Sequence, residues 1–393
     1  VRTLFFMERE GFAVDKNVLQ SLNKKFGEEL DKITTQILEY AGKSFNINSP
    51  KQLATVLFDD LGLQSGKKNK TGLSTNVDVL MSLQNEHPII PLVLRHRELS
   101  KLKSTYLEGM LPLIDSNGRI HTVFKQTVVA TGRLSSTEPN LQNIPVRKEE
   151  GKLIRQMFVA KQGNRLVSAD YSQIELRLMA VFSDDPTMVA AFRNKVDIHA
   201  TTASQVLGIP IESVTAEQRR QAKAVNFGII YGISDFGLAN DLGIAVWQAR
   251  EFIKKYFETY PQVKIYMDRM IELAKEKGYA MTYLGRKREI PELRSSNFNT
   301  RGFGERIAMN MPLQGSASDI IKLAMLNVDE ALKQRNLKSK LIMQVHDELI
   351  LDCPNNEVEE VKILLKNCME GVAKFSVELV ADCNDGQNWL EAK

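Results

Sequence analysis

Most of the chain carries the hydrophobic spacing of amphipathic helices. Apolar residues that recur three and four positions apart lie on one face of a helix. This spacing runs through residues 1–40, 95–111, 175–304, 317–336 and 357–374. A proline directly after the second of these stretches is expected to end its helix. Helices therefore dominate the prediction, with a few strands between them.

Strands and breaks are expected at fewer places. Residues 120–124 alternate apolar and polar side chains, and residues 377–380 form a short apolar run, so both predict strands. Residues 62–74 are rich in Gly, Lys, Ser and Thr and predict an exposed loop between helices. Within the long helical region, breaks are expected at residues 184–186, 208–210 and 260–261, and a hairpin at 284–286.

Acidic residues follow apolar runs in two segments that lie far apart in the sequence. Residues 166–169 lead into Asp170, and residues 341–351 are apolar on both sides of Asp347. These runs predict a buried strand and a hairpin with carboxylates at its tip. If the strand lies beside the hairpin, the two carboxylates meet and need a cation between them. A divalent metal is the usual cation, and Mg²⁺ pairs serve phosphoryl transfer. Ordinary solvated carboxylates are the alternative.

A third segment, residues 217–232, places cations and aromatic rings at helical spacing. Side chains four positions apart share one face, because each step drifts only about 40° around the helix axis. The stripe consists of Arg219, Lys223, Phe227 and Tyr231. Its cations suit a triphosphate, and its aromatic rings suit a base or sugar. A helix with a solvated basic edge would explain the cations but not the aromatic residues. The opposite face is expected to pack inward through Ala222, Val225 and Ile229.

Composition limits the class of protein without identifying it. At 393 residues and 44.4 kDa the chain is too long for one ordinary core, so two or three subdomains are expected. The net charge is only +4. Basic side chains nevertheless cluster, and the clusters together fit a phosphate-neutralising groove, although each alone fits a solvated surface. The clusters are Lys67, Lys68 and Lys70; Arg95, Arg97, Lys101 and Lys103; and Arg286, Lys287 and Arg288.

Cysteine and histidine give no sign of a disulfide framework or a zinc site. The three cysteines lack CxxC spacing and the five histidines lack an HxxxH pattern, so a reducing, cytoplasmic setting is expected. No run of eighteen apolar residues is present, and the N-terminal residues lack the build of a signal peptide. The sequence starts inside a helical pattern without an initiator Met, and we therefore expect a fragment or a processed product.

Taken in chain order, the segments around Asp170, residues 217–232 and Asp347 resemble motifs A, B and C of the family A DNA polymerases. The resemblance covers essentially the whole chain as a polymerase domain only. Further segments strengthen it. Residues 131–136 with 139–145 resemble the family's primer–template loop, and residues 102–106 resemble its thumb. The family's second template-contacting helix has similar residues here at four positions: Asn310, Pro312, Gln314 and Gly315.

The resemblance implies an α+β fold shaped like a right hand. A helical thumb and helical fingers would surround an antiparallel palm sheet. The expected parts are an opening helix packed on the palm (1–14), the thumb (15–112), the first palm segment with motif A (113–176), the fingers with motif B (177–301) and the second palm segment with motif C (302–393).

It also implies roles at the catalytic centre. Asp170 and Asp347 would hold two Mg²⁺ ions, which Mn²⁺ can replace, with the Tyr171 carbonyl as a further ligand and Glu348 as a less direct one. Lys223 would join the two aspartates as a catalytic residue, since it could donate a proton to pyrophosphate. Nucleotide contacts are expected from Arg219, Lys223, Phe227, Tyr231, Glu175, Gln173 and His199.

The resemblance also implies that two of these residues select the sugar. Glu175 resembles the family's steric gate, with Tyr231 beneath it in the space that a ribose 2′-hydroxyl needs. Phe227 would pack against the sugar, where Phe disfavours dideoxynucleotides and Tyr accepts them. Arg133 could reach the minor groove, whose acceptors are nearly the same for every correct base pair. DNA contacts are expected from Arg133, Asn143, Arg306, Asn310, Gln314, His346 and Lys103.

The implied activity is that of a DNA-directed DNA polymerase, a nucleotidyltransferase that adds deoxynucleotides to a primer 3′ end by two-metal phosphoryl transfer in DNA replication or repair. Its partners would be primer–template DNA and deoxynucleoside triphosphates, with no membrane. We expect a monomer in a bacterial nucleoid or a phage-infected cell, and no thioredoxin-binding insertion is evident. Proofreading is not expected, because residues 1–130 contain no second carboxylate constellation.

Two other functions compete with this reading. A single-subunit phage-type RNA polymerase would share the hand and the metal aspartates, but it needs room for the 2′-hydroxyl, which Glu175 would fill. A non-catalytic DNA-binding remnant would be expected to have lost Asp170, Asp347 or Lys223, and all three are present.

Overall fold

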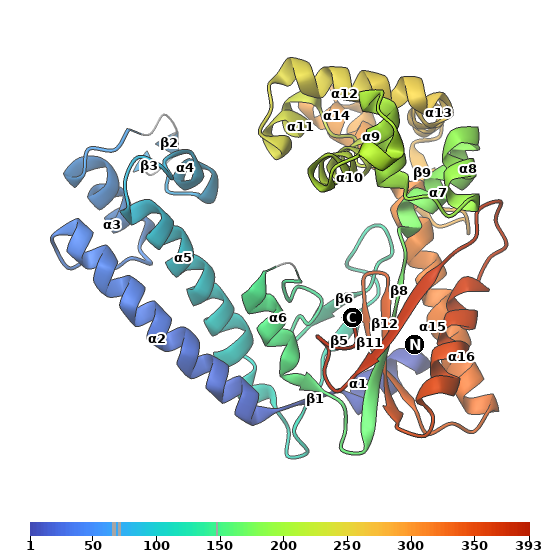
Figure 1. The fold of residues 1–393 in the computed structure, drawn as a ribbon, viewed down its shortest axis with the longest axis horizontal. Coiled ribbons are helices and arrows are strands. Elements are labelled where there is room, and N and C mark those ends of the chain that lie inside the picture. Colours follow the sequence, from blue (N-terminus) through green and yellow to red (C-terminus); the bar gives the residue numbers. More distant parts are fainter. Residues whose placement is uncertain (65–67, 70–71, 147) are drawn as a thin grey trace.

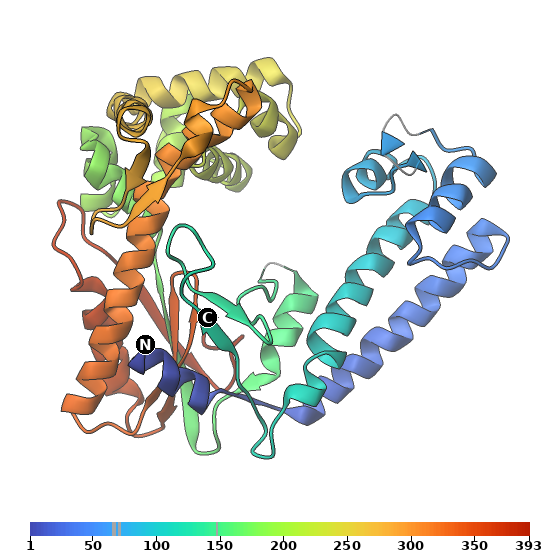
Figure 2. The ribbon, with the colours of Figure 1, turned by 180° about the vertical axis from the view of Figure 1, so that it is seen from behind.

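The computed structural model describes residues 1–393 except 65–67, 70–71 and 147. Figure 1 shows a helical arm in blue and cyan, a region built on a sheet of green and red strands, and a second group of helices in yellow-green. The two helical regions rise from opposite sides of the sheet in both views (Figures 1 and 2). The predicted combination of many helices with an antiparallel sheet is confirmed.

The central sheet joins segments from the middle and the end of the sequence. Its strands are β11 (Lys340–Val345), β12 (Glu348–Pro354), β8 (Asn164–Tyr171) and β13 (Ala381–Gly386), in that order. Every neighbouring pair is antiparallel, and Glu348 lies opposite Asp170 in the register of β12 and β8. The predicted strand and hairpin therefore lie side by side. Helices α15 (Ser316–Gln334) and α16 (Val358–Glu370) pack against this sheet, as their apolar spacing predicted.

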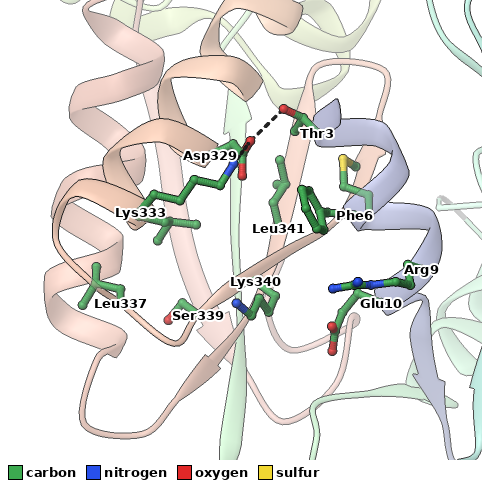
Figure 3. Close-up of a pocket in the computed structure, with 12 residues that line it drawn as sticks. Thr3, Phe6, Arg9, Glu10, Asp329, Lys333, Leu337, Ser339, Lys340 and Leu341 are labelled. Carbon is green, nitrogen blue, oxygen red and sulfur yellow. Dashed lines mark hydrogen bonds and ion pairs between the residues drawn. The ribbon is translucent and has the colours of Figure 1, made fainter. Parts of the chain in front are cut away.

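Helix α1 (Arg2–Glu10) packs against β11 and α15 (Figure 3). Phe6 and Leu341 line a pocket between these elements. At its rim, Thr3 Oγ1 donates a hydrogen bond of 2.8 Å to Asp329 Oδ2, and Lys333 Nζ donates to the same oxygen at 2.6 Å. These contacts fix the start of the chain to a helix more than three hundred residues later.

The helical arm is built on two long antiparallel helices. Helix α2 (Lys16–Ala41) begins where the Asp15 side chain accepts hydrogen bonds from the first free backbone N–H groups. Its partner α5 (Ile89–Leu102) starts earlier than the predicted residue 95 and continues as a π-helix to Glu108. The shorter elements of the arm are α3 (Pro50–Ala54), η1 (Thr55–Asp60), β2 (Lys68–Asn69), β3 (Gly72–Leu73), α4 (Val77–Ser82) and η3 (Leu111–Leu113).

The second helical group follows the predicted breaks. Asp185 caps α8 and a hairpin replaces helix at β9 and β10, as the Pro and Gly residues indicated. No helix within the described ranges is long and apolar enough to cross a bilayer. The elements are α7 (Ile174–Ser183), α8 (Pro186–Arg193), α9 (Ile198–Leu207), η4 (Ile211–Ser213), α10 (Ala216–Ile230), α11 (Asp235–Leu242), α12 (Val246–Thr259), α13 (Pro261–Lys277), β9 (Tyr279–Met281), β10 (Lys287–Glu289), η5 (Pro291–Arg294), α14 (Phe298–Asn310) and η6 (Met311–Gly315).

Two strand predictions were wrong in detail. Residues 120–124 do not form one strand, because β4 (Arg119–Ile120) pairs with β1 (Phe12–Val14) whereas β5 (Val123–Lys125) pairs with β6 (Ser135–Thr137). The chain changes partner where Thr122 Oγ1 donates to the Pro139 carbonyl at 2.8 Å. The remaining elements here are α6 (Glu149–Gln156) and β7 (Phe158–Val159), which pairs with β1.

The final strand also lies later than predicted. Val377 and Leu379 are buried, but they precede the ladder, which runs along β13 from Ala381. Apolar character reports burial rather than strand pairing, so an edge strand made of polar residues escaped the pattern. The residue limits expected for the subdomains remain predictions.

Candidate active site

The two predicted aspartates meet at one end of the central sheet. Asp170 stands near the end of β8, and Asp347 lies in the turn between β11 and β12. The Tyr171 N–H donates to the Asp347 carbonyl at 3.1 Å, which holds strand and turn together. Burial raises the pKa of Asp170 to about 6 and that of Asp347 to about 7. Both carboxyls are therefore poorly stabilised as anions by the protein alone.

These residues fit a divalent cation. Asp347 Oδ1 is buried without a hydrogen-bond partner among the described residues, and Arg133 Nη2 lies 3.9 Å from it. Carboxylate and carbonyl oxygens are the ligands that Mg²⁺ prefers. Within the described residues, no group of three His, Cys, Asp or Glu side chains is placed to hold a metal. A metal here would thus rest on two aspartates and on backbone or water oxygens.

Glu348, the predicted less direct ligand, is held by other protein groups. Its side chain is buried, and Oε1 accepts hydrogen bonds from Ser168 Oγ at 2.8 Å and Trp389 Nε1 at 3.1 Å. Oε2 accepts from Lys393 Nζ at 3.0 Å. The guanidinium of Arg155 lies 4.0 Å from the Trp389 ring centroid. Glu348 is therefore held by partners within the protein, opposite Asp170 in the ladder, and no local pattern in the sequence revealed these partners.

Helix α10 presents the predicted stripe to the same pocket. Thr215 and Gln218 cap its start reciprocally. The inward packing of Ala222, Val225 and Ile229 is confirmed by their burial. The Phe227 and Tyr231 rings are stacked, with centroids 6.5 Å apart. One pocket is lined by the stripe together with Asp170, Asp347, Tyr171, Gln173, Glu175, His199, His346 and Arg133.

The phosphate end of the stripe contains a partner that the sequence did not indicate. Arg219 Nε donates to Asp197 Oδ2 at 2.7 Å, and Nη2 lies 2.7 Å from the same oxygen in an ion pair. Asp197 also caps α9 through Oδ1, which accepts from the His199 N–H at 2.8 Å. Within the described part of the chain, Lys223 forms no ion pair. His199 itself is buried, and its Nδ1 lies 2.9 Å from Asn226 Nδ2.

The sugar end joins three predicted residues. Tyr231 donates to Glu175 Oε2 at 2.5 Å, and Arg133 Nη2 donates to Oε1 at 2.8 Å. Burial raises the pKa of Tyr231, and the neighbouring Glu175 carboxylate raises it further. The contact between Glu175 and Tyr231 was expected, whereas the Arg133 contact was not, because Arg133 was assigned to DNA.

The expected DNA contacts are distributed over the surrounding elements. Asn143 and His346 line a second pocket beside Asp170 and Asp347. On α14, Asn310 Nδ2 donates to the Tyr231 carbonyl at 3.4 Å. Arg306 also lies on α14, and Gln314 lies on η6, which follows it directly.

Several basic residues are already engaged. Arg95 pairs with Glu29 at 2.8 Å and Glu150 at 2.6 Å, and Lys103 on the helical arm pairs with Glu108. Lys67 and Lys70 lie outside the described residues, and so does the side chain of Lys68. The cluster around Arg95 therefore stabilises the arm more than it offers free charge.

Comparisons with known proteins agree with this geometry. A model of the family described as DNA polymerase family A matches residues 16–391. DNA polymerase I of Caldicellulosiruptor bescii is 51% identical over 394 residues, which cover 100% of this chain and 46% of that protein. DNA polymerase I of Geobacillus stearothermophilus is 50% identical over 389 residues, covering 98% and 44% respectively. The chain thus spans less than half the length of these curated relatives.

A solved structure is similar throughout. It is the POL domain of Pol1 from M. smegmatis in complex with DNA primer-template and dNTP. The TM-score is 0.95 at 44% sequence identity, with 100% of this chain and 69% of that chain covered. This likeness confirms the predicted right-hand fold.

Proposed function

Because the chain belongs to DNA polymerase family A, we propose that it is a DNA-directed DNA polymerase that adds deoxynucleotides to a primer 3′ end on a template. One observation carries the proposal. The poorly stabilised carboxylates of Asp170 and Asp347 share a pocket with the cations and aromatic rings of α10. That combination suits transfer of a nucleotidyl group from a triphosphate.

The metal ligands would be Asp170, Asp347 and the Tyr171 carbonyl, with Glu348 supporting them through its own fixed partners. Two Mg²⁺ ions, or Mn²⁺ in their place, would lower the pKa of the primer 3′-hydroxyl and neutralise the leaving pyrophosphate. The buried Oδ1 of Asp347, which has no hydrogen-bond partner in the described part of the chain, supports this assignment, since an uncompensated carboxylate in such a position is costly.

The protein's own side chains would bind and orient the nucleotide. Arg219 and Lys223 would hold the β- and γ-phosphates, and Lys223 would donate a proton to the departing pyrophosphate. His199 would add a phosphate contact. Phe227, Tyr231 and Gln173 would position the base and sugar, and Glu175 would exclude a ribose 2′-hydroxyl.

Primer–template DNA would lie over the pockets on the palm side of α14. The similar Pol1 domain is described in complex with DNA primer-template and dNTP, which supports the same partners here. The residues proposed to contact DNA are Arg133, Asn143, Arg306, Asn310, Gln314, His346 and Lys103. We further propose that the chain acts as a cytoplasmic monomer and does not remove mismatched primer ends.

Primer extension with matched variants tests the proposal. Asp170→Asn and Asp347→Asn keep side-chain shape, so both should abolish extension while primer–template affinity stays within a few-fold. Asp385→Asn is the control, because Asp385 is a carboxylate of the same sheet that pairs with Arg165 and Lys362 instead. It should extend normally. Extension by either active-site variant at a tenth of the parent rate or better would contradict the two-metal assignment.

A further inference from the structure

Behind the nucleotide pocket, four buried polar side chains form one hydrogen-bonded row. Asn226 on α10 stands in the middle and is 0% exposed. On one side its Nδ2 lies 2.9 Å from His199 Nδ1. On the other side its Oδ1 lies 3.1 Å from Thr202 Oγ1, which also lies 3.0 Å from the Tyr260 hydroxyl and donates to the Ile198 carbonyl at 2.8 Å. The row thus connects the pocket wall with the junction of α12 and α13.

The orientation of the Asn226 amide determines which nitrogen of His199 carries the proton. An amide has an acceptor oxygen and a donor nitrogen, and in the structure the NH₂ group of Asn226 faces His199. Nδ1 of His199 must then accept. In a neutral imidazole the other nitrogen, Nε2, carries the proton.

His199 is neutral in its surroundings. Burial lowers its pKa to about 4, and Arg219 and Lys223 lower it as well, although Asp197 opposes them. Nε2 forms no hydrogen bond within the described residues, and His199 lines the pocket that contains Arg219 and Lys223. The Nε2–H group of His199 is therefore available to donate a hydrogen bond to a ligand in the pocket.

We propose that Asn226 is a positioning residue that holds His199 as its Nε2–H tautomer, so that the ring offers the pocket a hydrogen-bond donor rather than a lone pair. This inference rests on the proposed function, which brings a triphosphate into the pocket. Phosphate oxygens only accept hydrogen bonds, so a lone pair on Nε2 would repel them. The contact with Thr202 holds the other end of the Asn226 side chain in place.

A spectroscopic measurement tests the tautomer without any nucleotide. Protein labelled with ¹⁵N-histidine gives distinct ring-nitrogen shifts for the two tautomers, and His199→Gln identifies the signals of His199 among the five histidines. We expect the Nε2–H pattern in the parent. Asn226→Asp, which can only accept, should move a proton to Nδ1. An Nδ1–H pattern in the parent, or unchanged signals in Asn226→Asp, would overturn the proposal.

A double-mutant cycle tests the link to nucleotide binding. Asn226→Leu should raise the KM for the deoxynucleotide about tenfold, the scale of one lost hydrogen bond, with a smaller effect on kcat. Added to His199→Gln, it should raise KM no further, because Asn226 acts through His199. Effects that multiply would show that Asn226 only supports the fold, and the positioning role would then be wrong. Asn226→Asp keeps the side-chain volume and repeats the cycle if the Leu variant does not fold.

Tyr256→Phe is the matched control. The Tyr256 hydroxyl is buried in the same helical group without a hydrogen-bond partner among the described residues. Its removal should leave both the His199 signals and KM unchanged. A parent protein without primer extension would refute the proposed function and the triphosphate contact together, while the spectra would still decide the tautomer.

Discussion

The Tyr231 hydroxyl donates a 2.5 Å hydrogen bond to Glu175 Oε2 from the C-terminal end of α10, 56 positions further along the chain. Glu175 is 4% exposed, and its other oxygen accepts from Arg133. A buried carboxylate requires such partners. The pair therefore forms a fixed wall at the end of the pocket opposite Arg219 and Lys223.

Removal of this wall should weaken sugar selection. Glu175→Ala is expected to admit ribonucleotides and to reduce discrimination against them by about tenfold or more, with some loss of overall rate. Tyr231→Phe keeps the ring but deletes the hydrogen bond, so its effect should be intermediate. The measurement is the ratio of kcat/KM for each deoxynucleotide and its ribonucleotide. Unchanged discrimination in Glu175→Ala would rule out the steric gate.

The sequence predicted the parts of the site that depend on local pattern. Asp170 and Asp347 each follow an apolar run, and the stripe on α10 follows from helical spacing, so their positions were accessible without a structure. The meeting of the two aspartates followed from one assumption, namely that the strand lies beside the hairpin in the sheet.

Contacts made across the fold were not accessible in this way. Asp197 neutralises Arg219 from another helix, and Trp389 with Lys393 engages Glu348 from the end of the chain. The sequence around each of these residues does not indicate a partner that lies so far along the chain. For the same reason the basic residue Arg95 was assigned to phosphate, although two glutamates of the protein already pair with it.

The other side of the sugar pocket should control the 3′ position. Phe227 stacks on Tyr231 and has no polar group at its ring edge. Phe227→Tyr adds a hydroxyl that can take the place of an absent 3′-hydroxyl. We expect dideoxynucleotide use to rise by about tenfold or more, while ribonucleotide rejection stays unchanged. Competition between dideoxy- and deoxynucleotides measures the first quantity, and a rise in ribonucleotide use would contradict the separation of the two roles.

The stability of the metal-free protein should show how much the buried carboxylate of Asp347 destabilises the fold. Asp347→Asn replaces a carboxylate whose Oδ1 is buried and unpartnered among the described residues. In a chelating buffer the free energy of unfolding of the variant should therefore be higher than that of the parent by about 1 kcal/mol or more. Added Mg²⁺ should stabilise the parent and not the variant. Denaturant unfolding with and without Mg²⁺ measures both effects, and equal stabilisation of the two proteins would argue against a metal at Asp347.

A pH effect is expected far from the active site, at Glu357. Burial would raise its pKa above the ordinary 4.5, but hydrogen bonds from Ser339 Oγ and the N–H groups of Lys338 and Ser339 outweigh burial and lower it. The carboxylate therefore stabilises the folded state fully above pH 4.5, and this contribution is lost as pH falls through the lower folded value. Glu357→Gln should cost on the order of 2 kcal/mol at pH 7, and the cost should shrink as pH falls below 4.5. A cost independent of pH would contradict this account.

The two cations of the α10 stripe, Lys223 and Arg219, should affect different kinetic constants. Lys223, without an ion pair in the described chain, is expected to act on the chemical step, so Lys223→Ala should lower kcat on the order of 10²-fold. Arg219→Ala should mainly raise the KM for the nucleotide. Steady-state constants near those of the parent for both variants would refute the assignment of this helix to phosphate binding.

Asp197 adds a sharper test, because it competes with the nucleotide for Arg219. The Arg219 guanidinium contacts Oδ2, whereas Oδ1 caps α9 by accepting from the N–H groups of His199 and Ala200. Asp197→Asn keeps a capping oxygen and removes the negative charge. Arg219 should then bind phosphate more readily, and the KM for the nucleotide should fall by about threefold or more. In Arg219→Ala the same substitution should change nothing. A KM that stays the same or rises in Asp197→Asn, with the helix still folded, would mean that this ion pair holds Arg219 in place for the nucleotide instead of competing with it.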